Sequence, residues 1–181
     1  MNKKSWEVPL EKIKELREMT SCGVLECKKA LTEAGGDFPK AKEILQKRGR
    51  ELAESKKDRA TKAGRVEAYV HLGSQIGVLV EVDCETDFVA KSEDFCAFTK
   101  DLALQITAGA PRYITKEEIP PQILESQPDP EEFLKVHCLM NQPFIKNPQL
   151  TIQDYFNQLV AKIKENIFIR RFVRYQVGLD I

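Results

Sequence analysis

The sequence lacks the signatures of most catalytic chemistry. Its only two histidines, His71 and His137, lie far from any cysteine or serine arrangement that would mark a nucleophile. The motifs GxxxxGKS/T, GxGxxG and HExxH, typical of phosphate loops, dinucleotide sites and zinc hydrolases, are absent. Five cysteines without a CxxC pair argue against a disulfide framework or a zinc site and favour a reducing compartment. We therefore expect neither catalysis nor a cofactor or metal within this chain.

Long apolar runs are also missing. No stretch approaches the roughly 18 apolar residues of a membrane span, and Met1–Lys4 is not followed by the apolar run of a signal peptide. Of 181 residues, 31% are charged and 42% hydrophobic, which is ordinary for a folded, water-soluble protein. The length fits one domain, or one domain with a small module, and we expect it in the cytoplasm.

Net charge is zero, but the charges are unevenly distributed. Residues 1–65 carry 17 Lys and Arg against 11 Asp and Glu, which leaves 11 and 17 for residues 66–181. A basic first third fits either solvated helix faces or contact with nucleic acid or phosphate. No arginine-rich tract interleaved with aromatics is present, so solvated helix faces are the simpler interpretation.

Helical spacing predicts three short helices in residues 1–50. Apolar residues of the first helix recur at Leu10, Ile13, Leu16 and Met19, and the second helix, Val24–Ala34, has one face made of Val24, Cys27, Leu31 and Ala34. Thr20 or Ser21 is the expected cap of the second helix, and Gly35-Gly36 its stop.

The third helix is expected to begin after an Asp37 cap, with Pro39 in its first turn, and to close at Gly49. Three such helices form a small bundle similar to a ubiquitin-associated module, a type that usually binds proteins. Residues 51–65, basic and poor in large apolar groups, are predicted as an exposed linker. The domain boundary is expected there.

From residue 66 the hydrophobic period changes to two, which predicts an α+β core in residues 66–181. Val66–Leu72 and Ile76–Glu85 read as an antiparallel hairpin, with Gly73 available for positive φ in the turn. Ser92 is the expected cap of a following helix. The buried stripe of that helix consists of Phe95, Phe98, Leu102 and Ile106.

Residues 109–150 hold most of the nine prolines and are predicted as a covering segment whose role stays open. Residues 152–164 form an amphipathic helix and residues 166–178 a last strand. Strict alternation on that strand places Arg170, Phe172, Arg174 and Gln176 on one face and Arg171 with Ile169, Val173, Tyr175 and Val177 on the other. Pairing this strand beside the acidic hairpin strand sets opposite charges across a three-stranded antiparallel sheet.

Acidic residues alternate along the second hairpin strand at Glu81, Asp83, Glu85 and Asp87. A metal or acid/base site is one interpretation, but the Gly-punctuated loop of a hard-cation site is missing, so a solvent-facing strand is simpler. Cys84 is expected on the apolar side. Where the strand ends, Thr86-Asp87-Phe88-Val89 presents a large aromatic beside a carboxylate, an arrangement suited to pressing rigidly on a partner.

The chain resembles the elongation factor Ts family, the guanine-nucleotide exchange factors of the translation GTPase elongation factor Tu. Two motifs carry the resemblance, residues 16–31 (Leu16-Arg17-Glu18-Met19-Thr20 through Cys27-Lys28-Lys29-Ala30-Leu31) and residues 77–90 (Gly77-Val78-Leu79-Val80-Glu81-Val82 into Thr86-Asp87-Phe88-Val89-Ala90). Residues 142–144, 165–167 and 170–171 also look like family segments.

The resemblance implies that Asp87 and Phe88 push beside the nucleotide and magnesium site of the GTPase, framed by Thr86 and Val89. It also implies docking through the helical module, which would place its contacts at Lys14, Arg17, Val24 and Leu25. Only one hairpin pattern is present, so the chain looks like a short form, for which a homodimer and a two-plus-two complex with the GTPase are expected. Two other classes stay open: a ubiquitin-associated-like adaptor and an RNA-binding translation protein.

Overall fold

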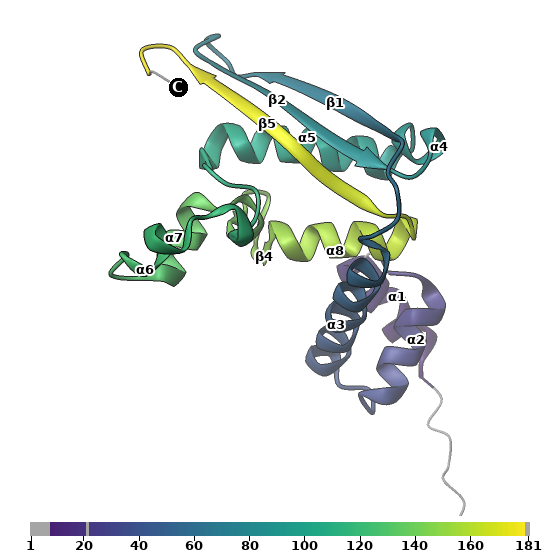
Figure 1. Cartoon of the computed structure of the whole chain (residues 1–181). Coiled ribbons are helices and arrows are strands. Elements are labelled where there is room, and N and C mark those ends of the chain that lie inside the picture. Colours follow the sequence, from purple (N-terminus) through teal and green to yellow (C-terminus); the bar gives the residue numbers. More distant parts are fainter. Residues whose placement is uncertain (1–7, 21, 180–181) are drawn as a thin grey trace, which may run out of the picture. The chain divides into compact units, whose positions relative to one another are not determined.

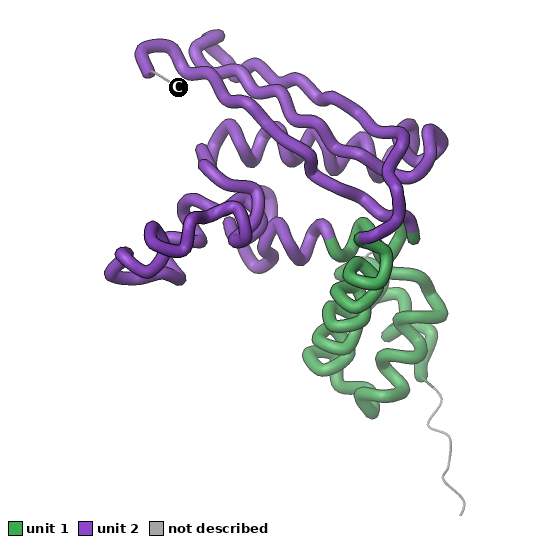
Figure 2. The backbone as a smooth tube through the Cα atoms, in the orientation of Figure 1, with its two compact units in different colours: residues 1–57, 157–164 green, residues 58–156, 165–181 purple. Residues whose placement is uncertain are grey.

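The structure of the chain, a computed structural model, describes residues 8–20 and 22–179 and divides into two compact units (Figure 2). The first unit comprises Met1–Lys57 and Asn157–Lys164, and the second comprises Asp58–Phe156 and Glu165–Ile181. The described residues form eight α-helices and a three-stranded antiparallel sheet, which confirms the α+β class (Figure 1). The predicted division into residues 1–50, 51–65 and 66–181 stays a prediction.

The first unit contains the three expected helices, α1 (Leu10–Thr20), α2 (Val24–Glu33) and α3 (Phe38–Lys56). Their shared core consists of Val8, Ile13, Leu16, Cys22, Cys27, Ala30, Leu31, Ala41 and Leu45. The predicted apolar stripes are only partly buried, because Leu10, Met19 and Val24 are exposed. The helices therefore keep apolar side chains at the surface after their common core is filled.

The predicted caps of these helices have different outcomes. Asp37 caps α3 as expected, and its side chain accepts a hydrogen bond from the Lys40 amide at 3.0 Å. The prediction for Thr20 is wrong, since its hydroxyl donates back to the Leu16 carbonyl at 2.7 Å within α1. The alternative cap, Ser21, lies outside the described residues, and α2 begins after Gly23 without a side-chain cap.

The predicted end of the third helix at Gly49 is also wrong, because α3 continues through this residue to Lys56. A Cβ atom at position 49 would lie 3.4 Å from the Asn157 carbonyl oxygen. Asn157 belongs to α8 (Ile152–Ile163), the amphipathic helix predicted over residues 152–164. At this distance a Cβ would make ordinary van der Waals contact, so the glycine lies inside the helix against another segment of the same unit and does not mark a helix terminus.

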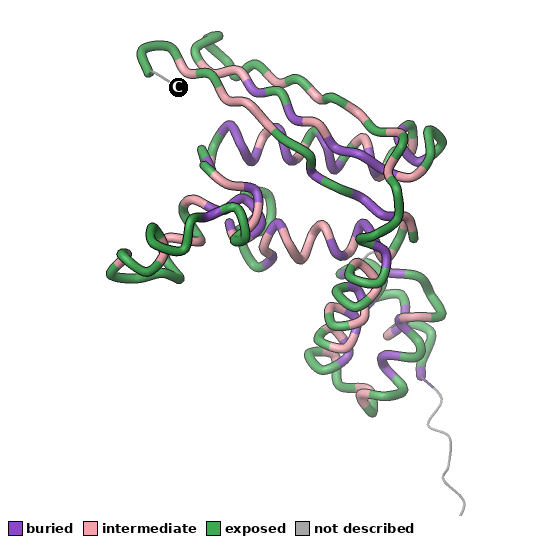
Figure 3. Tube along the Cα trace, viewed as in Figure 1, coloured by how far each residue is buried: buried purple, intermediate pink, exposed green. Residues whose placement is uncertain are grey.

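The sheet of the second unit has the order β1-β2-β5, formed by β1 (Ala63–Val70), β2 (Ile76–Cys84) and β5 (Ile167–Gln176). Both pairings are antiparallel, so the hairpin and the placement of the last strand are confirmed. One face of β2 is buried through Val78, Val80, Val82 and Cys84 (Figure 3). Helix α5 (Glu93–Gly109) packs on β1 and β2.

Helix α5 forms as the sequence predicts. The Ser92 hydroxyl caps it by accepting from the Phe95 amide at 3.4 Å. The predicted stripe of Phe95, Phe98, Leu102 and Ile106 has no exposed surface at all. At the C-terminal end of α5, the Arg174 guanidinium of β5 donates to the Thr107 carbonyl at 3.3 Å. This bond gives a partner to one of the last carbonyls of the helix, which have no amide partner within the helix itself.

A β-bulge in β5 overturns the predicted alternation of its two arginines. Glu81 pairs with Arg171 and Val82 with Ile169, so Arg170 is the extra residue. Arg171 consequently lies on the opposite face from buried Ile169, although strict alternation placed them together. Both arginines still meet the acidic strand, as expected: Arg171 donates to Glu81 at 2.6 Å, and Arg170 donates to Asp83.

The proline-rich segment folds into short elements. These are the 3-10 turns η1 (Lys116–Glu118) and η2 (Leu139–Asn141), helices α6 (Pro121–Glu125) and α7 (Pro130–His137), and the paired strands β3 (Pro143–Phe144) and β4 (Asn147–Thr151). A buried amide pair ties the segment to α5, because Gln105 donates to the Gln142 side chain at 3.0 Å. Within the described ranges, no helix combines the length and apolarity needed to cross a bilayer.

The aromatic cluster beneath the sheet predicts a large stability loss on truncation. Phe98 is fully buried, and its ring centroid lies 5.2 Å from that of Tyr155 and 6.1 Å from that of Phe156. Phe98→Ala should lower the free energy of unfolding by about 3–5 kcal/mol, because it removes apolar contacts and leaves a cavity. Urea denaturation followed by circular dichroism measures this. The control Val136→Ala, at an exposed site on α7, should change stability by less than about 0.5 kcal/mol.

Candidate functional site

The exposed aromatic predicted from the sequence lies in a single helical turn directly after β2. This turn is α4 (Asp87–Ala90), and Thr86 is its N-cap with extended backbone angles of φ −127° and ψ 153°. The Thr86 hydroxyl oxygen accepts from the Val89 amide at 3.3 Å. Phe88, with 81% of its surface exposed, is among the most exposed large apolar side chains in the described part of the chain.

The opposite side of this turn is fixed in the core. Val89 and Ala90 are buried, so Val89 anchors the turn and does not face solvent. The Cys84 thiol donates to the Thr86 carbonyl at 3.1 Å, and the Ser92 hydroxyl donates to the Val89 carbonyl at 2.8 Å. A buried valine and two side-chain hydrogen bonds thus hold the backbone from which Phe88 projects.

The carboxylate next to Phe88 has a partner on its own helix turn. Lys91 donates to Asp87 at 3.0 Å, and both side chains are largely exposed. This hydrogen bond and the lysine charge lower the pKa of Asp87, so the group is ionised at neutral pH. A partner that approaches Phe88 therefore meets a negative charge beside the ring and a positive charge one turn later.

Glu165 contacts the same turn from a distant part of the sequence. Its carboxylate accepts from both the amide and the hydroxyl of Thr86, at 3.0 and 2.7 Å. Sequence reasoning noted residues 165–167 only as a family segment and assigned Glu165 no role. No local pattern could have placed it here, because 79 positions separate the two residues.

The predicted contact residues of the first unit lie on both sides of the α1–α2 connection. Lys14 and Arg17 are exposed on α1. Val24 and Leu25, at the start of α2, are 47% and 71% exposed, and Met19 near the end of α1 is 56% exposed. The unit therefore exposes both cations and apolar side chains on α1 and at the start of α2, which is a composition suited to binding a protein.

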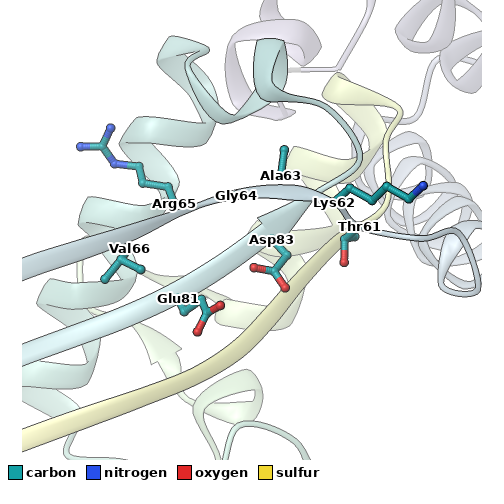
Figure 4. Close-up of a pocket in the computed structure, with 8 residues that line it drawn as sticks. All are labelled: Thr61, Lys62, Ala63, Gly64, Arg65, Val66, Glu81 and Asp83. Atoms are coloured by element: carbon teal, nitrogen blue, oxygen red, sulfur yellow. The ribbon is translucent and has the colours of Figure 1, made fainter.

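The acidic strand lines a shallow hollow of about 400 Å³ on the sheet (Figure 4). Glu81 and Asp83 project to one side of it, while Arg65 turns away and donates to Glu67 at 2.7 Å. Each of the two carboxylates is ion-paired with an arginine of β5. Across residues 8–20 and 22–179, no group of three or more His, Cys, Asp or Glu side chains is arranged to hold a metal ion.

The two histidines lie in ordinary structural contacts. His71 Nδ1 is 3.3 Å from the Tyr69 hydroxyl in the hairpin. The His137 ring packs on Phe133 with centroids 4.6 Å apart, and burial together with the Arg112 charge lowers its pKa. Neither ring contacts a cysteine or serine through a hydrogen bond in the described structure that would make a nucleophile pair.

Comparison with known proteins gives one consistent family. Residues 39–130 match the family model described as elongation factor TS. The chain is 44% identical to the elongation factor Ts of Carboxydothermus hydrogenoformans, over 92% of this chain and 87% of that protein. It is 45% identical to that of Heliobacterium modesticaldum, over 92% and 88%. Identity to that of Caldanaerobacter subterraneus subsp. tengcongensis is 42%, over 96% and 98%.

The anchoring of the turn predicts a difference in thiol reactivity. The pKa of the Cys84 thiol is raised to about 11, mainly by burial and to a smaller extent by the charge of Glu165. Almost none of this thiol is therefore thiolate at pH 8. Cys96 is the half-buried cysteine, and the other four are buried. A native protein titrated with an aromatic disulfide reagent should therefore react first at Cys96, as read by mass spectrometry of peptides. Rapid labelling of Cys84 would show that the turn opens readily.

Proposed function

The chain belongs to the elongation factor Ts family, and on this basis we propose that it is a guanine-nucleotide exchange factor for the translation GTPase elongation factor Tu. It promotes GDP release by disturbing the magnesium and nucleotide site of that partner during translation elongation. No bond is made or broken by the chain itself, so it is not an enzyme in the bond-making sense. Its place of action is the cytoplasm.

The observation that carries this proposal is the exposed ring of Phe88 on an anchored turn. An apolar side chain with 81% of its surface in water contributes little to the stability of the chain itself. Its presentation on an anchored turn therefore favours a role in contact with a partner. Asp87 lies beside it, while Thr86 and Val89 fix the backbone on either side. Together these four residues form the wedge: Asp87 and Phe88 enter the GTPase, and Thr86 and Val89 frame the turn that presents them.

The free energy of burying the Phe88 ring is large enough to weaken GDP binding substantially. Burying a phenylalanine side chain contributes about 1.5–3 kcal/mol. If that energy is gained only in the partner conformation with a displaced magnesium site, it weakens GDP binding by roughly ten- to 150-fold. Coupling is reciprocal, because GDP then weakens binding of the factor by the same ratio, and the factor is released for another cycle.

The first unit supplies docking in this scheme. Its three helices act as a ubiquitin-associated-like module whose contacts with the GTPase are Lys14, Arg17, Val24 and Leu25. The apolar pair contributes buried area, and the two cations add long-range attraction to an acidic surface. Since docking and wedge lie on different units, affinity and the rate of GDP release can be altered separately.

The second unit also has a surface suited to a second copy of the chain. The face of the sheet opposite the buried β2 valines exposes Val66, Val70, Leu79, Phe168 and Tyr175. The ion pairs of Glu81 and Asp83 with the β5 arginines lie on this same face. When the sheet of a second copy covers this face, the two chains form a homodimer. A homodimer whose two chains each bind one GTPase is a two-plus-two complex.

The wedge assignment is tested by the release of fluorescent GDP from elongation factor Tu. Phe88→Ala should lower the release rate at saturating factor by at least about tenfold, because the buried ring is the largest single contribution of the wedge. The matched control is Val136→Ala, another exposed apolar position, which should leave the rate unchanged.

Two results would contradict these assignments in different ways. A wild-type chain that leaves GDP release at its spontaneous rate excludes the exchange function and favours a binding adaptor. Exchange by Phe88→Ala at the wild-type rate retains the function but removes Phe88 from it.

The dimer is tested by light scattering at micromolar concentration. The wild-type chain should scatter as a particle of twice its 20.7 kDa mass. Leu79→Asp places a charge in the centre of the exposed sheet face and should give the monomer mass while circular dichroism shows that the chain stays folded. A wild-type chain that scatters as a monomer up to its highest soluble concentration rules the homodimer out.

A further inference from the structure

The turn that presents Phe88 is bonded across the fold by two carboxylates. Glu165 accepts from the Thr86 amide and hydroxyl at 3.0 and 2.7 Å. In return, Glu85 accepts from the Asn166 amide at 2.6 Å. Each chain segment thus caps the backbone of the other, and we name Glu85, Thr86, Glu165 and Asn166 the carboxylate clamp.

The clamp begins where the sheet ends. The last paired residues of β2 and β5 are Cys84 and Ile167, so the ladder provides no bond to Thr86 or to Glu165. Asn166 extends the clamp to the connection before β1, because its side-chain amide donates to the Arg59 carbonyl at 2.7 Å. The clamp therefore continues the restraint of the sheet into the segment that carries the wedge.

The Thr86 hydroxyl has two roles that depend on one another. Its oxygen accepts from the Val89 amide and thereby caps α4, while its hydrogen is donated to Glu165. A hydroxyl has one donor and two lone pairs, so donation to a fixed carboxylate leaves the lone pairs directed at the helix turn. Without Glu165 the hydroxyl rotates freely, and the amide of Thr86 loses its acceptor.

The turn is short, and its other restraints act on its buried residues and on its carbonyl groups. Helix α4 contains only Asp87–Ala90, and Phe88 is its second residue. The core anchors it through Val89 and Ala90, and the Cys84 thiol holds the Thr86 carbonyl. Glu165 supplies the restraint on the amide and hydroxyl at the N-terminal side of the turn. A rotation of the turn about its anchor would move the ring of Phe88 while leaving the buried residues in place.

Resting on the function proposed above, we propose that Glu165 is a positioning residue for exchange: it sets the direction of Phe88 through its two hydrogen bonds to Thr86. Glu165 does not itself need to contact the GTPase. Its removal should leave docking intact and weaken the ability of the bound factor to displace GDP. Reactions that depend on a fixed geometry lose about two orders of magnitude for displacements near 1 Å, and a partial loss is expected here.

The test measures GDP release as a function of factor concentration, with the full chain and its GTPase. Glu165→Ala should lower the saturating release rate by about tenfold, with a half-saturating concentration within about twofold of wild type. Glu165→Gln, whose amide oxygen can accept one of the two bonds, should recover part of the loss. A purely structural loss of folded protein would instead raise the half-saturating concentration and leave the saturating rate as in wild type.

A double-mutant cycle with Phe88→Ala identifies the path of the effect. If Glu165 acts through Phe88, Glu165→Ala should change the saturating rate of the Phe88→Ala variant by less than about twofold. The matched control is Glu132→Ala on α7, which removes a carboxylate that pairs with Lys135 and lies outside the clamp. It should keep a saturating rate within about twofold of wild type.

The outcomes separate this inference from the function on which it rests. If the wild-type chain does not accelerate GDP release, both fail. If it does, any of three results overturns the positioning role alone. These are a wild-type saturating rate for Glu165→Ala, independent effects of the Glu165 and Phe88 changes, and an equal loss in the control Glu132→Ala. Circular dichroism shows whether Glu165→Ala is folded at the assay temperature. If it is not, the double-mutant cycle is made with Glu165→Gln, which has nearly the same shape as the wild-type side chain.

Discussion

The antiparallel pairing of β2 with β5 is the interaction on which the second unit depends. It joins residues about 90 positions apart and makes β2 the central strand, with Val80 and Val82 fully buried against the helical layer. It also sets the end of β2 beside the start of β5, and the turn that carries Phe88 follows that end directly. The position of the exposed ring is consequently fixed by long-range strand pairing, although the ring lies in a local turn.

Much of this architecture could be predicted because its causes are local. A period of two in β2, the Ser92 and Asp37 caps and the stripe of α5 all depend on neighbouring residues, and the structure confirms each of them. The exposed aromatic at position 88 was also expected, from its place at the strand end together with the family resemblance. Alternation, capping and helical spacing are properties that a short window of sequence contains.

The predictions that failed depended on contacts that a local window does not contain. Gly49 looked like a helix end, but α3 continues through it and packs there against Asn157, more than 100 positions later. Arg170 breaks the alternation of β5 because of a bulge, which no property of the arginines themselves reveals. Glu165 belonged to a noted segment, yet its contact with Thr86 became visible only in the folded chain.

The bulge at Arg170 has a consequence for how copies of the chain can associate. β5 is an edge strand of the sheet, and an edge with a regular ladder is a template on which further strands can add without limit. The extra residue interrupts the spacing of the free backbone groups, and it also brings two charged side chains to the same stretch. The bulge thereby disfavours the unlimited addition of further copies of the chain along the β5 edge. Contact between the sheet faces of two copies is not affected, and it is complete once two copies have associated.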